Sequence, residues 1–252
     1  MSLIDIGAFR SVPLSAEPFP HAVVPNFIRP HSMPAVIADY PDVSQGGSFP
    51  VNALTYGPAF AQLCQELTGE LLHAAFEEKF DVDLSERPTT LTVRGWCRAR
   101  DGRIHTDSKT KLITVLIYVH GSWTASGGRL RLLRSPDDLG NYALEVAPEH
   151  GTLVCFRNSS TAWHGHEPYE GKRRVLQLNW VTDERSARGV ARRHGLSFLL
   201  KRMNPFRGAS YYESTRRRRS DLPSPLYGRG SGRGKDQGRG DLSLSGVARL
   251  AP

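Results

Sequence analysis

The segment Arg103-Ile104-His105-Thr106-Asp107 opens a region of apolar runs that closes with Trp163-His164-Gly165-His166-Glu167-Pro168. The first segment places a histidine and an aspartate two positions apart, and the second adds two more histidines. On a β-strand, side chains two positions apart point to the same face of the sheet. The spacing therefore predicts a strand that presents the first pair on one face, opposite a histidine from a neighbouring strand, His164 or His166.

The region between these segments consists of short apolar and β-branched runs that are separated by turn residues such as Gly127-Gly128. The longest run, Lys111–Val119, is typical of a central strand. Short strands at near-regular spacing indicate a β-sandwich, a jelly roll or a barrel. The other strands are expected at Leu91–Trp96, Arg129–Leu133, Ala143–Val146, Gly151–Phe156 and Arg174–Trp180.

The pair His105 and Asp107, together with one distal histidine, could coordinate a metal ion from one side and leave the opposite side open. This donor set suits Fe(II), and with open positions it is the facial triad of non-haem iron oxygenases. For the distal ligand we favour His164, because Pro168 follows it by four residues and Arg174 follows it by ten. The open positions would accept a bidentate co-substrate and then O₂.

A guanidinium near such a metal ion could hold the distal carboxylate of the co-substrate through two parallel hydrogen bonds. We expect Arg174 in this role, and the doublet Arg173-Arg174 leaves the choice between the two arginines open. Tyr118 ends the predicted central strand and could donate its hydroxyl to the same carboxylate, with a purely structural core aromatic as the alternative. Lys111 is expected on a solvated face.

Along residues 91–183 the chain resembles the prolyl 4-hydroxylase-like branch of the 2-oxoglutarate- and iron(II)-dependent dioxygenases. A His-x-Asp motif alone is weak, but an ordered set of such motifs is specific. The residues that carry the resemblance are, in order, His105-Thr106-Asp107, Tyr118-Val119-His120, Gly127-Gly128-Arg129-Leu130-Arg131-Leu132, Val154-Cys155-Phe156, Trp163-His164 with Pro168, and Arg174 with Trp180.

The resemblance implies a mainly β fold with flanking helices (α+β) and a double-stranded β-helix, or jelly-roll, core. It implies iron bound by His105, Asp107 and His164, and 2-oxoglutarate bound by Arg174 with help from Tyr118. Such an enzyme would convert 2-oxoglutarate and O₂ into succinate and CO₂ while it hydroxylates a C–H bond, with ascorbate as a further candidate cofactor. The substrate would be a protein side chain such as proline, or a small metabolite or saccharide.

The remainder of the chain is expected to support or extend this core. Residues 1–90 are expected to form a supporting segment whose clearest helix spans about residues 58–80, with Pro58 at the first helical position. Residues 91–183 are the expected dioxygenase core, and a further helix is expected at residues 184–206. The apolar face of the first helix is predicted from the spacing of Phe60, Leu63, Leu67, Leu71, Leu72 and Phe76.

The net charge of +8 is concentrated at the C-terminal end. From Arg207 onward there are ten Lys+Arg and four Asp+Glu residues, so this tail carries +6 and residues 1–206 carry only +2. The Arg/Gly-rich composition of residues 207–252 predicts disorder. A nucleic-acid-associated protein that acts through this tail is one alternative function, although the near-neutral remainder gives no support to nucleic acid as the substrate of the core.

The three cysteines are scattered, and no Cys-x-x-Cys pair occurs. This argues against a disulfide scaffold and against a thiolate zinc site, and it fits a reducing cytoplasm. The N-terminal residues lack the basic and apolar pattern of a secretory signal, and no apolar stretch approaches the roughly 18 residues of a membrane span. A jelly-roll binding module without redox chemistry is the second alternative function.

Overall fold

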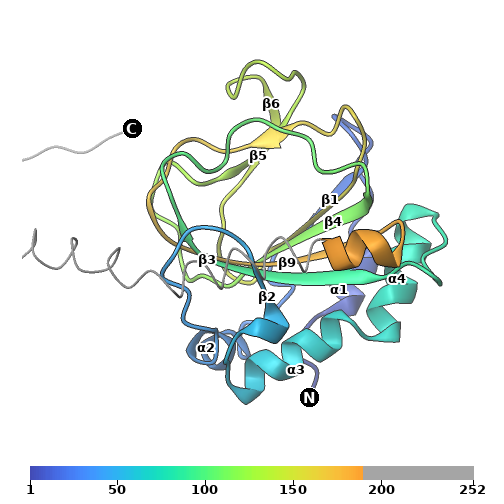
Figure 1. Ribbon diagram of the computed structural model, residues 1–252, viewed down its shortest axis with the longest axis vertical. Helices are drawn as coiled ribbons and strands as arrows, with labels where there is room; N and C mark the ends of the chain where they lie inside the picture. The colour runs from blue at the N-terminus through green and yellow to red at the C-terminus, as the bar shows by residue number, and fades with distance from the viewer. Residues whose placement is uncertain (190–252) are drawn as a thin grey trace, which may run out of the picture. The chain divides into compact units, whose positions relative to one another are not determined.

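A computed structural model of the chain describes residues 1–189, which form two antiparallel sheets with helices packed on one side (Figure 1). The larger sheet has the strand order β1-β7-β4-β9-β3-β2, and the smaller one has the order β6-β5-β8. The predicted α+β class with a jelly-roll core is confirmed. The strands are β1 (His21–Val24), β2 (Phe49–Pro50), β3 (Thr89–Cys97), β4 (Lys111–Tyr118), β5 (Leu130–Leu133), β6 (Tyr142–Val146), β7 (Leu153–Arg157), β8 (His164–Gly165) and β9 (Gly171–Val181).

The six strands predicted between residues 91 and 180 are confirmed as β3, β4, β5, β6, β7 and β9. Strand β8 carries the histidine that was expected on a neighbouring strand, but no bounds were predicted for it, because its two residues are too few to show an alternating pattern. β9 is the longest strand, and it pairs with β4 on one side and with β3 on the other. The N-terminal segment contributes β1 and β2 to the edges of the same sheet.

Alternation along the central strands of the larger sheet creates two separate cores. Ile113, Val115 and Ile117 of β4 face the helices, whereas Leu116 and Tyr118 face the space between the two sheets. β9 follows the same rule, with its apolar side toward the helices and a more polar side toward the smaller sheet. The inner side of the sheet is therefore free to carry polar side chains into the jelly roll.

The helices cover the outer face of the larger sheet (Figure 1). The prediction of one helix over residues 58–80 is wrong, because the chain leaves helical geometry at Thr68-Gly69. Gly69 has an extended backbone, and glycine is a poor helix former. The break turns Leu71 outward, with 71% of its surface exposed. The helices are α1 (Ile6–Ser11), α2 (Met33–Ala38), α3 (Pro58–Leu67), α4 (Glu70–Phe80) and the 3₁₀ turn η1 (Val51–Ala53).

Residues 184–189 are helical, and the Asp183 carboxylate accepts a hydrogen bond from the Ser186 N–H at the start of this turn. The remainder of the helix predicted at residues 184–206, and the tail predicted to be disordered at residues 207–252, lie outside the described residues. Within residues 1–189, no helix has the length and apolar character that crossing a membrane requires.

Candidate metal centre

His105 and Asp107 lie in the connection between β3 and β4 and not on a regular strand, which corrects the sequence-based expectation. The only β contact there is an isolated bridge in which the backbones of His105 and His164 exchange two hydrogen bonds of 3.0 Å. Gly102 bends the connection with a φ of +81°, and a Cβ at this position would meet the His166 ring at 2.2 Å. The turn at Gly102 thus brings His105 next to β8, although the segment that carries His105 is not a regular strand.

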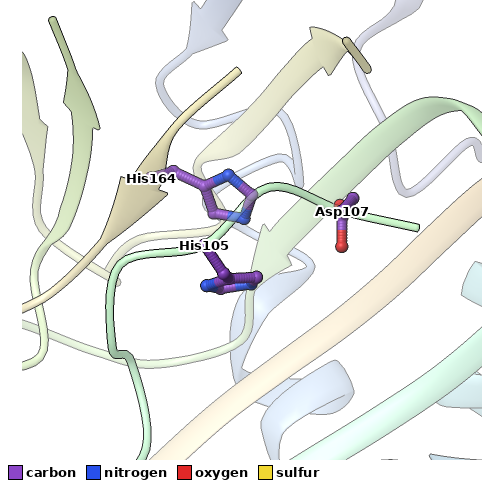
Figure 2. A group of neighbouring side chains, drawn as sticks. All are labelled: His105, Asp107 and His164. Atoms are coloured by element: carbon purple, nitrogen blue, oxygen red, sulfur yellow. The ribbon is translucent and has the colours of Figure 1, made fainter. Parts of the chain in front are cut away.

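The connection and β8 bring His105, Asp107 and His164 together (Figure 2). Each side chain offers one ligand atom, and these three atoms lie within 4.8 Å of one another. The Nδ1 atom of His105 donates to the carbonyl of Arg103 at 2.7 Å, and that of His164 donates to the carbonyl of Ala162 at 3.0 Å. A carbonyl oxygen can only accept, so both rings carry a proton on Nδ1, which leaves Nε2 as the atom that could bind a metal ion.

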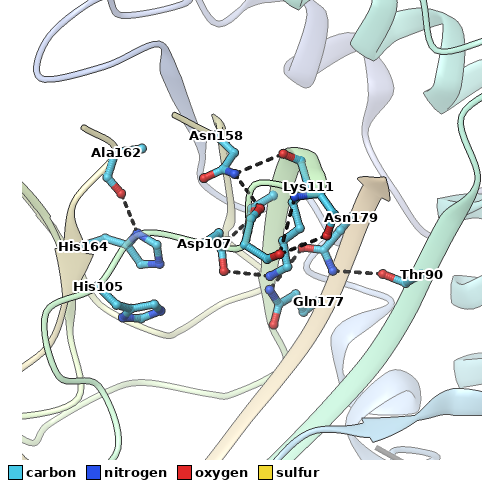
Figure 3. Close-up of polar contacts among 12 residues, drawn as sticks. Thr90, His105, Asp107, Lys111, Asn158, Ala162, His164, Gln177 and Asn179 are labelled. Atoms are coloured by element: carbon cyan, nitrogen blue, oxygen red, sulfur yellow. Dashed lines mark hydrogen bonds and ion pairs between the residues drawn. The ribbon is translucent and has the colours of Figure 1, made fainter. Parts of the chain in front are cut away.

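Two side chains fix the carboxylate of Asp107, and Figure 3 shows one of them, Lys111, beside it. The Lys111 ammonium lies 2.7 Å from Oδ1, and the Thr114 hydroxyl donates to Oδ2 at 2.6 Å. Burial would raise the pKa of Asp107, but the positive charges nearby and these two hydrogen bonds outweigh it and lower the pKa. The aspartate is therefore held ionised. Lys111, expected on a solvated face, is instead its ion-pair partner.

Burial also keeps the histidine of β8 neutral. Removal from water, followed by the proximity of His105, lowers the pKa of His164 to about 4. A neutral imidazole is the form that binds a metal ion, so this side chain needs to lose no proton near neutral pH. His166, the other candidate, lies apart from the triad, with Nδ1 donating to the Glu167 carbonyl and Nε2 3.9 Å from the Cys97 sulfur.

Because His164 and His166 are buried, we expect the free energy of unfolding of the metal-free protein to decrease in acid. Burial, followed by the charge of Arg173, lowers the pKa of His166 to about 4, as burial does for His164. Between pH 6.5 and about 4, the unfolded chain binds protons at these positions that the folded chain does not, so the free energy of unfolding falls as the pH decreases. At about 1.4 kcal/mol per pKa unit, each histidine contributes roughly 3 kcal/mol at most.

Urea denaturation of the metal-free protein at several pH values between 4.5 and 7.5 measures this dependence. The His166→Gln variant should show a shallower slope than the wild type, because it lacks one of the two groups. A free energy of unfolding that stays constant down to pH 4.5 would contradict the predicted coupling.

The triad faces a cavity of about 500 Å³ between the two sheets. One wall of this cavity is the inner face of the larger sheet. This wall is formed by side chains from β3, β4 and β9 that lie opposite one another across neighbouring strands. Thr114 of β4 lies opposite Asn179 of β9, Leu116 lies opposite Gln177, and Val175 lies opposite Arg94 of β3. All six side chains line the cavity.

Arg174 does not reach this cavity, contrary to the expectation for a co-substrate residue. It lies on the helix side of β9, where it donates to the carbonyl of Ile37 at 3.3 Å and its guanidinium lies 5.3 Å from the Tyr40 ring centre. Arg173 has the opposite orientation and lines the cavity. Alternation along the strand places Arg173 on the same face as the polar pair Gln177 and Asn179, and the packing of the helices against the other face makes this the cavity side.

Arg173 lines the cavity, and Tyr118 is buried beside it. Arg173 is buried, its Nε donates to the Gly128 carbonyl at 2.8 Å, and its guanidinium lies 5.3 Å from the Tyr118 ring centre. This leaves the two terminal nitrogens as donors that a ligand could use. The hydroxyl of Tyr118 is buried and has no hydrogen-bond partner among the described residues. Such an orphaned group next to a cation suits an anionic ligand.

Comparison with known proteins gives one family match. Residues 97–182 match the model described as the 2OG-Fe(II) oxygenase superfamily. No curated protein matches the sequence significantly.

Solved structures resemble the chain only in outline. A prolyl-4-hydroxylase from Pseudomonas putida is 16% identical with a TM-score of 0.47, covering 71% of this chain and 93% of that chain. A prolyl 4-hydroxylase from Phytophthora capsici is 15% identical with a TM-score of 0.48, covering 72% and 64%. A viral collagen prolyl hydroxylase from Paramecium Bursaria Chlorella virus-1, in a 2OG complex, is 10% identical with a TM-score of 0.43, covering 65% and 96%.

Proposed function

We propose that this chain is a dioxygenase of the 2OG-Fe(II) oxygenase superfamily, whose model matches residues 97–182, and that it hydroxylates a C–H bond of its substrate at the cavity between the two sheets. The observation that carries the proposal is the convergence of His105, Asp107 and His164, with ligand atoms within 4.8 Å of one another, on a cavity that Arg173 also lines. We place the catalytic core at residues 91–183 and regard residues 1–90 as its support.

The donor set fits Fe(II), which takes imidazole nitrogen and carboxylate oxygen in a facial triad with open positions. His105, Asp107 and His164 would hold the metal ion, because two Nε2 lone pairs and an ionised carboxylate already face one another. Lys111 and Thr114 would keep the carboxylate in place. When bound, Fe(II) and 2-oxoglutarate would supply the oxidising power, with O₂ consumed and succinate and CO₂ released.

The distal carboxylate of 2-oxoglutarate would bind beside Arg173 and Tyr118. Arg173 would supply two parallel hydrogen bonds from its guanidinium, and the Tyr118 hydroxyl would donate a third. This moves the expected role from Arg174 to its neighbour, since only Arg173 lines the cavity. The burial of both side chains would exclude water from the carboxylate and strengthen these contacts.

The substrate remains one of the predicted classes, a protein side chain such as proline or a small metabolite or saccharide. Ascorbate as a further cofactor and a cytoplasmic location also stay predictions. All three cysteines are buried and free, so they are compatible with a reducing compartment.

Anaerobic titration tests the proposal without knowledge of the substrate. We expect the protein to bind one equivalent of Fe(II), and addition of 2-oxoglutarate should then produce the visible charge-transfer band of a chelated iron–keto-acid complex. Succinate as the co-substrate analogue is the matched control, because it lacks the keto group and cannot chelate in this way. A protein that binds no Fe(II), or that binds Fe(II) but shows no band with 2-oxoglutarate, would overturn the assignment.

Thr114 offers a test of how the carboxylate of Asp107 is positioned. The Thr114→Val variant keeps the shape of the side chain but removes the hydroxyl that donates to Oδ2. Loss of such an outer contact typically weakens metal binding by about 10- to 100-fold, and we expect a decrease in Fe(II) or Mn(II) affinity in this range. Thr110→Val is the control, because the Thr110 hydroxyl contacts Ser108 and not the aspartate. Equal metal affinity in both variants would refute the positioning role.

A further inference from the structure

Arginines outnumber carboxylates on the cavity wall. The two carboxylates are already paired, because Asp107 binds Lys111 and Asp101 binds Arg98, which lies outside the cavity wall. Among the described residues, the arginines of the wall therefore have no carboxylate partner. The charged residues of the wall are Arg94, Arg100, Arg103, Lys111 and Arg173, with Asp101 and Asp107.

Binding of Fe(II) and 2-oxoglutarate would not neutralise this excess of positive charge on the cavity wall. Fe(II) brings two positive charges, and 2-oxoglutarate brings two negative ones, so together they leave the net charge of the cavity unchanged. One co-substrate carboxylate would be used by Arg173 and the other by the metal ion. Arg94, Arg100 and Arg103 would still line the loaded cavity without an ion pair to a carboxylate among the described residues, because Asp101 is paired with Arg98.

Arg94 is the most informative of the three arginines. It lies on the inner face of β3, directly across from Val175 of β9, and it is half-buried. Its backbone carbonyl accepts a hydrogen bond from Tyr40. Asp101 is the carboxylate whose charge acts on the Arg94 guanidinium, and Asp101 forms its ion pair with Arg98 instead. Burial, followed by the charge of Arg173, lowers the pKa of Arg94. A partly buried cation beside another cation is costly unless an anion binds there.

Arg100 and Arg103 extend this positive surface to the outside. Both belong to the connection between β3 and β4, both are exposed, and both line the same cavity. The ion pair between Arg98 and Asp101, at 2.8 Å, braces the turn between them. Exposed arginines at the mouth of a cavity raise the local concentration of anions and steer them inward.

We propose that the substrate of this enzyme carries an anionic oxygen group, a carboxylate or a phosphate, which Arg94 binds inside the cavity after Arg100 and Arg103 have attracted it. This inference rests on the proposed function, because it assigns Arg173 and Tyr118 to 2-oxoglutarate and leaves the other arginines for the molecule that is oxidised. It defines the substrate class by charge, which the family match does not.

Calorimetry on the full chain tests this assignment. The protein is loaded with Mn(II), which replaces Fe(II) without turnover, and with saturating 2-oxoglutarate. It is then titrated with inorganic phosphate, with acetate, and with acetamide, which has the shape of acetate but no charge. We expect one equivalent of phosphate or acetate to bind and acetamide not to bind, and the tighter of the two anions identifies the group.

Variants locate the site. Arg94→Gln should weaken anion binding by about 10-fold or more, the loss of a charge-assisted hydrogen bond, while the affinity for 2-oxoglutarate stays within about 2-fold of wild type. The exposed pair Arg100→Gln/Arg103→Gln should weaken anion binding less and reduce its salt dependence. Arg185→Gln, an exposed arginine outside the cavity, is the control and should change nothing.

Three results would overturn the proposal: equal binding of acetate and acetamide, displacement of 2-oxoglutarate by the anions, or unchanged anion affinity in Arg94→Gln. A loss of 2-oxoglutarate binding in Arg94→Gln would place this arginine in the co-substrate site instead. If Arg94→Gln does not fold, Arg94→Lys and the exposed double variant decide the question. Wild-type protein that fails to retain Mn(II) and 2-oxoglutarate refutes the proposed function, and the same titration on the metal-free protein still tests the anion site.

Discussion

Replacing Asp107 with alanine is expected to abolish Fe(II) binding at micromolar concentrations and, with it, all consumption of 2-oxoglutarate. Asp107 is the only anionic member of the triad, and both of its oxygens are oriented by neighbours. Loss of an outer contact alone costs about 10- to 100-fold in metal affinity, so loss of the carboxylate itself should exceed about 100-fold. Calorimetric titration with Fe(II) under anaerobic conditions measures the change directly.

The same substitution leaves Lys111 without its partner in a site where only 15% of its side chain is exposed. A partly buried ammonium without a counter-charge is destabilising, so Asp107→Ala should also unfold at a lower urea concentration. Asp107→Asn keeps the shape and the Thr114 contact and should lose metal affinity with a smaller loss of stability. His31→Ala, an exposed histidine far from the triad in the sequence, is the control for loss of an imidazole. Undiminished Fe(II) affinity in Asp107→Ala would remove the basis of the metal site.

The second large effect is on the affinity for 2-oxoglutarate, and it is expected for Arg173 but not for the adjacent Arg174. Arg173→Gln is expected to raise the dissociation constant for 2-oxoglutarate by about 100-fold, because roughly 3 kcal/mol of charge-assisted hydrogen bonding to the carboxylate is lost. Arg174→Gln should leave this constant within about 2-fold of wild type, since its guanidinium lies on the other face of β9 against Tyr40 and the Ile37 carbonyl. Titration of the Mn(II)-loaded variants with 2-oxoglutarate makes the comparison.

The pair of variants acts as its own control, because the same substitution is made at neighbouring positions on opposite faces of one strand. Arg174→Gln should instead lower stability by about 1 kcal/mol through the lost backbone contact. Removal of the Tyr118 hydroxyl in Tyr118→Phe should weaken 2-oxoglutarate binding less than Arg173→Gln does. If Arg174→Gln, and not Arg173→Gln, eliminates co-substrate binding, the orientation of β9 described above is incorrect.

The contrast between Arg173 and Arg174 shows what a strand pattern cannot determine, namely which face of the strand lies toward the metal site. Strand β9 was predicted from its alternating apolar residues, and Leu176, Leu178 and Trp180 do pack against the helices. Alternation then places Arg173 and Arg174 on opposite faces, but the position of each face relative to the metal site depends on which side the helices cover. That choice is made by tertiary packing and not by the strand alone.

The triad shows the opposite case. His105, Asp107 and His164 were identified from residue type and spacing, although the connection that carries the first two is a turn and not a strand. The His-x-Asp motif alone is weak, and the prediction depended on the ordered motifs that follow it in the sequence. The contacts that support the triad were missed, since Lys111 and Thr114 carry no distinctive motif and acquire their role through distance alone.

The amino-acid sequence by itself predicted the strands of the core, the resemblance to an oxygenase family, and His105, Asp107 and a distal histidine as candidate metal ligands, because apolar periodicity and the donor chemistry of side chains are local properties. Only the tertiary structure decided that Arg173 faces the cavity, that His164 and not His166 lies beside Asp107, and that Arg94, Arg100 and Arg103 line the same cavity. These features depend on strand register, on the turn at Gly102 and on burial. All three arise when segments distant in sequence pack together.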